Sequence, residues 1–221
     1  MTGLVLDDVA ITLDGRPLVG PLSIEIAPGE VVTVMGPSGS GKSTLLAYVG
    51  GFLPKAFAAR GRVAVDGTEI GALPPEKRAV GILFQDDLLF PHLSVGGNLA
   101  FGLRGSVREA ARRRALVEEA LAQANLAGFA DRDPATLSGG QRARVALMRT
   151  LLAEPRALLL DEPFGKLDAT LRHDVRAFVF ARARDRGLPT LLVTHDAEDA
   201  RAAGGRVIEV GVDPGQDAPR S

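Results

Sequence analysis

Residues 36–43 read Gly-Pro-Ser-Gly-Ser-Gly-Lys-Ser, and this stretch decides how the chain folds. It follows an apolar run at 31–35 (VVTVM) and precedes a helical pattern over 43–50. The pattern G-x-x-x-x-G-K-[ST] between a strand and a helix is typical of a phosphate-binding loop, or P-loop. Its glycines let backbone N–H groups turn inward around phosphate oxygens, and the helix N-terminus adds a favourable dipole. The alternative, a Gly/Ser-rich surface turn, does not explain the strand and helix on either side.

The P-loop predicts a nucleoside triphosphate site without specifying the reaction. We expect Lys42 to reach the β- and γ-phosphates and the hydroxyl of Ser43 to ligate Mg²⁺. The remaining residues expected to form the phosphate cradle are Gly36, Pro37, Ser38, Gly39, Ser40, Gly41 and Thr44.

A second apolar run, at 157–160, ends in the acidic pair Asp161-Glu162. A carboxylate at a strand tip can hold Mg²⁺, so Asp161 is the second candidate metal ligand. Glu162 is then placed to polarise an attacking water as a general base. A solvated strand end explains an isolated Asp-Glu pair equally well, and the P-loop upstream favours the functional interpretation.

Composition narrows the function classes. The chain has 221 residues, 46% of them hydrophobic, and 26 basic against 27 acidic residues for a net charge of -1. A disordered chain and a generally basic nucleic-acid binder are therefore excluded. The absence of cysteine excludes disulfides and thiolate chemistry. No apolar run approaches the roughly 18 residues that span a bilayer, and the N-terminus lacks a secretory pattern. We expect a cytoplasmic location and a membrane role only through a partner.

Short apolar runs alternate with helical patterns, which predicts an α/β fold with a mostly parallel sheet. Three expected strands, at 31–35, 157–160 and 190–194, end in polar residues, as at the ligand edge of open parallel sheets. Residues 86–149 are rich in Ala, Arg, Glu and Leu and predict an inserted helical subdomain. We expect a catalytic core at 1–85 and 150–210, without an appended C-terminal domain, and a loose tail at 211–221.

The segment Leu137-Ser-Gly-Gly-Gln141, in order with the P-loop and the Asp161-Glu162 strand, resembles the signature of the ABC ATPase family. The resemblance covers about residues 4–210 and implies a P-loop core with an N-terminal antiparallel β subdomain. In that family two domains pair head to tail, and each signature caps the ATP held by the other. It therefore implies that Ser138, Gly139, Gly140 and Gln141 contact nucleotide in trans, in a homodimer.

Three further residues match loops of the same family. Gln85 matches the Q-loop glutamine, which senses the γ-phosphate or Mg²⁺, and it is therefore a third candidate metal ligand. His195 matches the switch histidine that contacts the γ-phosphate. Taken alone, Gln85 is a polar strand end and a lone histidine is more often structural. Asp168 matches the D-loop (165–168), whose aspartate joins the two sites, although Gly165 stands where Ser or Ala is usual.

Residues 90–102 resemble a segment of bacterial importer ATPases of the iron, thiamine, polyamine and sulfate type. This implies membrane permease subunits, an external substrate-binding protein and a place on the cytoplasmic face of the membrane, with no nucleic acid. Gly97 replaces the usual Glu of that segment. The expected permease contacts, which could equally pack the subdomain core, are Phe84, Leu88, Leu89, Phe90 and Leu93.

The resemblance also exposes a gap at the adenine site. Family members stack adenine on an aromatic residue about 23 positions before the P-loop, and this chain has Leu13 there. We expect Leu13 and Val19 to give only apolar contact and therefore weaker or less selective base binding.

A soluble, non-transport ABC ATPase and a nucleotide kinase are the competing functions.

Overall fold

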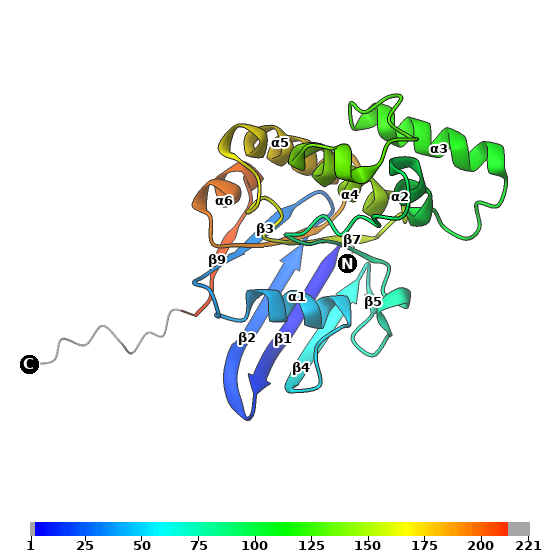
Figure 1. Cartoon of the computed structure of the whole chain (residues 1–221). Coiled ribbons are helices and arrows are strands. Elements are labelled where there is room, and N and C mark those ends of the chain that lie inside the picture. The colour runs from blue at the N-terminus through cyan, green and yellow to red at the C-terminus, as the bar shows by residue number, and fades with distance from the viewer. Residues whose placement is uncertain (1–2, 212–221) are drawn as a thin grey trace, which may run out of the picture.

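The computed structural model describes residues 3–211, so all but the first residue of the expected tail at 211–221 lies outside the described residues. It contains two β-sheets and a group of helices (Figure 1). The four-stranded antiparallel sheet has the order β2-β1-β4-β5, and the five-stranded parallel sheet has the order β6-β7-β8-β3-β9. The predicted α/β fold with a parallel sheet and an N-terminal antiparallel sheet is confirmed. The strands are β1 (Leu4–Leu13), β2 (Arg16–Ile26), β3 (Val31–Met35), β4 (Phe57–Val65), β5 (Thr68–Glu69), β6 (Val80–Leu83), β7 (Ala157–Asp161), β8 (Thr190–Thr194) and β9 (Val207–Glu209).

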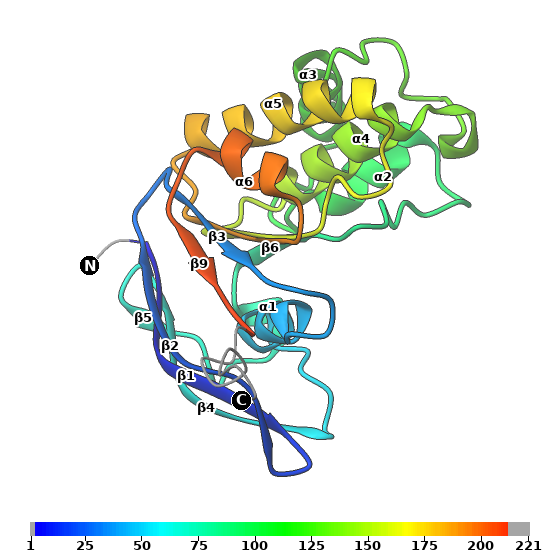
Figure 2. The same ribbon diagram turned by 90° about the vertical axis from the view of Figure 1, so that its left-hand side faces the viewer.

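The helices lie on both sides of the parallel sheet. Helix α1 lies between the two sheets, and α2 to α6 lie on the opposite face (Figure 2). The predicted amphipathic helix within 107–126 is α3, where Val117, Ala120 and Leu121 are buried and Leu116 is half-buried. Among the described residues, no helix is long and apolar enough to cross a membrane. The helices are α1 (Lys42–Gly50), α2 (Val95–Gly102), α3 (Ala110–Gln123), α4 (Gly139–Leu152), α5 (Ala169–Asp185) and α6 (Ala197–Ala203), with 3₁₀ turns at Pro75–Lys77 and Pro134–Thr136.

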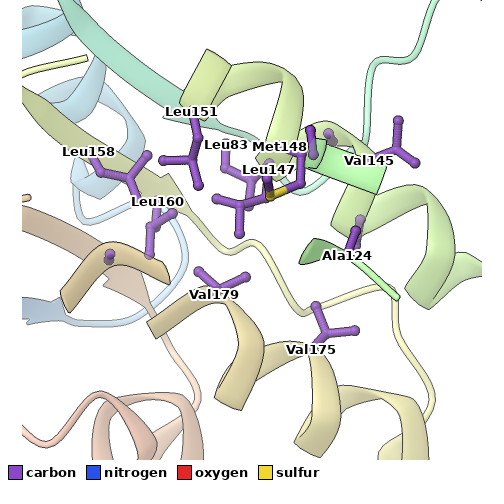
Figure 3. Packing of buried hydrophobic residues seen from close by; sticks show 14 of the residues in the cluster. Leu83, Ala124, Val145, Leu147, Met148, Leu151, Leu158, Leu160, Val175 and Val179 are labelled. Atoms are coloured by element: carbon purple, nitrogen blue, oxygen red, sulfur yellow. The ribbon is translucent and has the colours of Figure 1, made fainter. Parts of the chain in front are cut away.

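Alternation along β7 divides the core into two layers. Leu158 and Leu160 belong to the cluster packed against α4 and α5, while Ala157 and Leu159 belong to the cluster shared with α1 and the antiparallel sheet. Strand β7 is therefore buried on both faces, as expected for a central strand of a parallel sheet. Figure 3 shows the first cluster, in which Leu158 and Leu160 lie among Leu83, Leu147, Met148, Leu151, Val175 and Val179.

The strand register brings three loops to one edge of the parallel sheet. Met35 at the end of β3 pairs with Thr194 at the end of β8, and Asp161 at the end of β7 pairs with Val193. The P-loop follows β3, Glu162 follows β7 and His195 follows β8. Residues that are more than 100 positions apart in the chain therefore meet at this edge, which is where open α/β sheets bind ligands.

Candidate functional site

Two glycines give the P-loop its turn. Gly39 and Gly41 have φ angles of 84° and 86°, in the left-handed region that other residues rarely adopt. Space is also limited, because a Cβ on Gly41 would lie 2.4 Å from Cγ2 of Val19 and one on Gly36 would lie 2.3 Å from the carbonyl oxygen of Val210. Helix α1 begins at Lys42, directly after Gly41, so the loop leads into a helix N-terminus.

The lysine of the P-loop is held by the loop's own backbone. Lys42 is buried, and its Nζ donates hydrogen bonds to the carbonyl oxygens of Gly36 (2.8 Å) and Pro37 (2.9 Å). Ser38, Gly39 and Ser43 are exposed, so the outer side of the loop is open to solvent. The loop therefore presents a backbone concavity with a cation at its base, which suits the phosphates of a nucleotide.

Two of the three candidate metal ligands, Ser43 and Asp161, lie together. Oγ of Ser43 donates a hydrogen bond of 2.8 Å to Oδ1 of Asp161, which joins the start of α1 to the end of β7. Burial raises the pKa of Asp161, the neighbouring Glu162 raises it further, and the Ser43 hydrogen bond and Lys42 oppose this. A hydroxyl and a carboxylate are the hard oxygen donors that Mg²⁺ prefers alongside waters and phosphates. The residues fit this ion, and no cluster of three or more acidic, His or Cys ligands is found at 3–211.

Glu162 and His195 also meet, although they follow different strands, β7 and β8. Nδ1 of His195 lies 3.1 Å from Oε1 of Glu162, and the side chains are 57% and 21% exposed. Glu162 has a φ of 45°, an uncommon angle for a residue with a side chain and one that costs about 1–3 kcal/mol. Such strain is concentrated at functional sites. The pair therefore has the arrangement of a general base oriented by a neighbouring imidazole.

The Q-loop and D-loop border a cavity of about 530 Å³. Lys166 of the D-loop forms an ion pair with Asp86, and Arg142 of α4 forms one of 3.2 Å with Asp87. Burial raises the pKa of Asp87, and the hydrogen bond from Arg142 opposes it. The cavity lining includes Gln85, Leu88, Gly139, Arg142, Lys166 and Leu167. Gln85 and Gly139 of the signature therefore line the same cavity.

The signature segment is the N-terminus of α4. Ser138 caps this helix by accepting a hydrogen bond from N–H of Gln141 (3.3 Å), and Oε1 of Gln141 accepts one from N–H of Ser138 (2.9 Å). Gly140 is buried, with Leu171 and Val175 of α5 beside it. No hydrogen bond or ion pair within 3–211 joins residues 138–141 to the P-loop. Asp168 likewise caps α5 by accepting from N–H of Leu171 (3.0 Å).

The expected permease contacts divide into exposed and packed residues. Leu88 is 56% exposed, and Leu89 packs against the core. Phe90 packs on Phe101, with ring centroids 4.6 Å apart. Phe101 is itself 66% exposed and was missed from sequence, although it lies within the quoted segment. The other two expected contacts, Phe84 and Leu93, are half-buried. The ring of Phe84 packs against that of Phe52, with centroids 6.0 Å apart.

Other relevant residues were also missed from sequence. Leu13 pairs across β1 and β4 with Phe57, so an aromatic side chain lies beside the position that lacks one. Arg172 and Arg176 of α5 bond to the loops around Asp168 and His195. The available signal was their spacing of four residues, directly after the D-loop.

Comparison with known proteins agrees with this geometry. The family described as ABC transporter matches residues 19–165. An uncharacterized ABC transporter ATP-binding protein, YnjD of Escherichia coli, is 46% identical over 90% of this chain and 91% of its own length. The sulfate/thiosulfate import ATP-binding protein CysA of Gloeobacter violaceus is 43% identical over 89% of this chain. The spermidine/putrescine import ATP-binding protein PotA of Bacillus thuringiensis is 41% identical over 86%.

The chain spans 56% of the length of this CysA and 58% of this PotA. The match to the ABC transporter family covers the P-loop, the Q-loop, the signature and the Asp161-Glu162 pair. Of these, the P-loop and the Asp161-Glu162 pair lie at the edge of the parallel sheet. The chain therefore belongs to the ABC transporter family, as one of its ATP-binding proteins.

Proposed function

We propose that this chain is the ATP-hydrolysing subunit of an ABC importer and that it powers substrate movement through a separate membrane permease. The observation that carries the proposal is the pairing at one sheet edge of Ser43 with Asp161 (2.8 Å) and of Glu162 with His195 (3.1 Å). A nucleotide kinase would need an acceptor site and has no use for the signature. The import names of the relatives favour transport over a soluble function.

In this proposal each residue has one role. The P-loop N–H groups and Lys42 hold the phosphates, and Ser43 and Asp161 hold Mg²⁺. When bound, Mg²⁺ neutralises charge on the phosphates and orients them. Glu162 takes the proton of the attacking water, and the imidazole of His195, at Nδ1, keeps the carboxylate oriented. Gln85, at the edge of the cavity shared with the D-loop, reports the occupied site to the helices.

The signature supports a head-to-tail homodimer. Ser138, Gly139 and Gln141 lie at a second helix N-terminus, where the helix dipole favours an anion. That end has no bond to the P-loop of its own chain within the described residues, so we assign it to the nucleotide of a second copy. We assign Asp168, the N-cap residue of α5, to the contact between the two copies.

The membrane partners follow from the exposed apolar surface near the Q-loop. Leu88 and Phe101 are the exposed members of this surface, and they fit a short apolar helix of a permease. A substrate-binding protein on the far side of the membrane completes the importer. The subunit is then peripheral, on the cytoplasmic face.

Substitution Glu162→Gln tests the catalytic claim. The amide keeps the shape of the side chain but cannot take a proton, so we expect ATP binding to be retained, a closed dimer to be trapped, and hydrolysis to fall about 10²–10⁴-fold. The matched control is Glu118→Gln on the exposed face of α3, which should leave turnover unchanged. Full turnover in Glu162→Gln would show that Glu162 is not the general base.

Two measurements separate the competing functions. Release of phosphate from ATP without any nucleotide acceptor excludes a kinase. Purification of the chain from membranes together with an integral membrane protein supports the transporter, whereas a chain that never associates with one supports a soluble ATPase.

A further inference from the structure

Two arginines of α5 connect loops that the nucleotide chemistry uses. Arg172 and Arg176 are four residues apart, so they lie on the same face of the helix. The helix itself begins directly after Asp168, its N-cap residue. Both arginines bond to Asp196, the residue that follows His195.

Arg172 forms a bridge between two loops. One terminal nitrogen, Nη2, donates to the carbonyl oxygen of Leu167 (2.9 Å), next to Asp168. The other, Nη1, donates to Oδ2 of Asp196 (3.0 Å). Because a guanidinium is planar and rigid, two bonds from one group fix the relative position of the two acceptors. The D-loop and the loop after β8 are therefore tied together through one side chain.

Arg176 also holds the loop after β8, through ion pairs with Asp196 and Asp199. Its side chain is 8% exposed and pairs with Asp199, which is 4% exposed, and with Oδ2 of Asp196 at 3.2 Å. Oδ2 of Asp199 accepts from the hydroxyl of Thr194 (3.0 Å), and that hydroxyl accepts from N–H of Asp196 (3.0 Å). Buried charge pairs with every partner satisfied are rigid and costly to break.

This network encloses His195 on both sides along the chain. Thr194 precedes it and Asp196 follows it, and the side chains of both are held by bonds that lead to α5. Asp196 additionally caps α6 by accepting from N–H of Glu198 (2.7 Å). The 3.1 Å approach of His195 to Glu162 therefore depends on where α5 holds these neighbours.

We propose that Arg172 is a positioning residue that links the D-loop to the His195–Glu162 pair, so that a displacement of the D-loop changes the placement of the general base. The inference rests on the proposed ATPase function. Since Asp168 is expected at the contact between two copies, Arg172 makes hydrolysis in each site sensitive to the partner. No hydrogen bond or ion pair of the described residues joins Arg172 to the P-loop, so we expect nucleotide binding to be independent of it.

The test measures steady-state hydrolysis and nucleotide affinity in the full chain. Arg172→Gln should lower kcat about 10-fold or more, because small misplacements near reacting groups cost up to about 100-fold, with the Kd for ATP unchanged. Arg172→Lys keeps the charge but cannot span both acceptors, so its kcat should lie between that of the wild type and that of Arg172→Gln. The control is Arg182→Gln, whose arginine forms an ion pair with Asp185 and lies over the ring of Phe178, both on the same helix, and it should leave kcat unchanged.

A double-mutant cycle gives the decisive readout. If Arg172 acts through His195, Arg172→Gln should cost little further activity in a His195→Ala background. If Arg172→Gln does not fold, Asp196→Asn breaks the same link while an asparagine still caps α6, and the cycle is repeated with it. Losses that simply multiply, or a weaker Kd with an unchanged kcat, would overturn the inference. Its failure is distinguishable from that of the proposed function, because Glu162→Gln would still lower hydrolysis about 10²–10⁴-fold.

Discussion

Alanine substitutions at Gly41 and Gly39 separate backbone strain from crowding in the P-loop. The two glycines have nearly the same φ, 86° and 84°. They differ in their surroundings, because a Cβ on Gly39 would meet no atom within 4 Å, whereas one on Gly41 would lie 2.4 Å from Val19 and 2.9 Å from Leu18. Gly39→Ala is therefore a matched control for Gly41→Ala.

The expected losses of unfolding free energy follow from the backbone strain and the steric crowding at each position. A left-handed backbone costs an alanine roughly 1–2 kcal/mol. Alanine also lowers the conformational entropy of the unfolded chain, which offsets roughly 0.4–1 kcal/mol of this cost. We expect Gly39→Ala to lose about 1 kcal/mol of unfolding free energy. Crowding adds roughly 1–3 kcal/mol at Gly41, because Val19 is buried and cannot move aside. Gly41→Ala should therefore lose about 2–4 kcal/mol.

Calorimetry of the nucleotide-free protein measures the difference. For a domain of this size each kcal/mol lowers the Tm by roughly 2–4 °C. The expected decreases are about 2–4 °C for Gly39→Ala and about 4–16 °C for Gly41→Ala. Equal decreases would refute the steric argument, and no decrease in either variant would refute the assignment of strain to these positions.

Three more outcomes can be measured. Leu13→Tyr should strengthen ATP binding roughly 5- to 150-fold, since stacking on a base is worth about 1–3 kcal/mol, and an unchanged affinity for ATP and GTP would contradict the gap at this position. Asp161→Asn should abolish the Mg²⁺-dependent part of ATP binding and leave binding in a chelator unchanged; a retained Mg²⁺ effect would count against Asp161 as a ligand. Burial acts to raise the pKa of Asp196, but the N–H of Glu198 and the charge of Arg176 outweigh it and the pKa is lowered. Stability from this carboxylate is thus present above the ordinary Asp pKa and lost as the pH falls through the lower folded value. The Tm difference between wild type and Asp196→Asn should shrink in acid, and one that grows there would disprove the reasoning.

The local elements were predictable because their signals lie within a few consecutive residues. The P-loop, the buried strands at 31–35, 157–160 and 190–194, and the helix within 107–126 all match the structure. Each depends on alternation, periodicity or a glycine pattern that the neighbouring residues alone determine. The residue-level roles assigned to these motifs remain predictions.

Contacts across the chain could not be predicted in the same way. Leu13 and Phe57 are neighbours only because β1 pairs with β4 in a particular register. Phe101 is exposed because α2 presents it outward, and nothing in its local sequence distinguishes it from the packed Phe90.

By itself, the sequence determined the fold class and the position of the P-loop between a strand and a helix, because both depend on short-range backbone patterns. Only the tertiary structure decided that Glu162 meets His195, and that Arg172 ties the D-loop to the residue after that histidine. These contacts join separate strands and a helix, and their distances depend on strand register and helix packing, which no local pattern specifies.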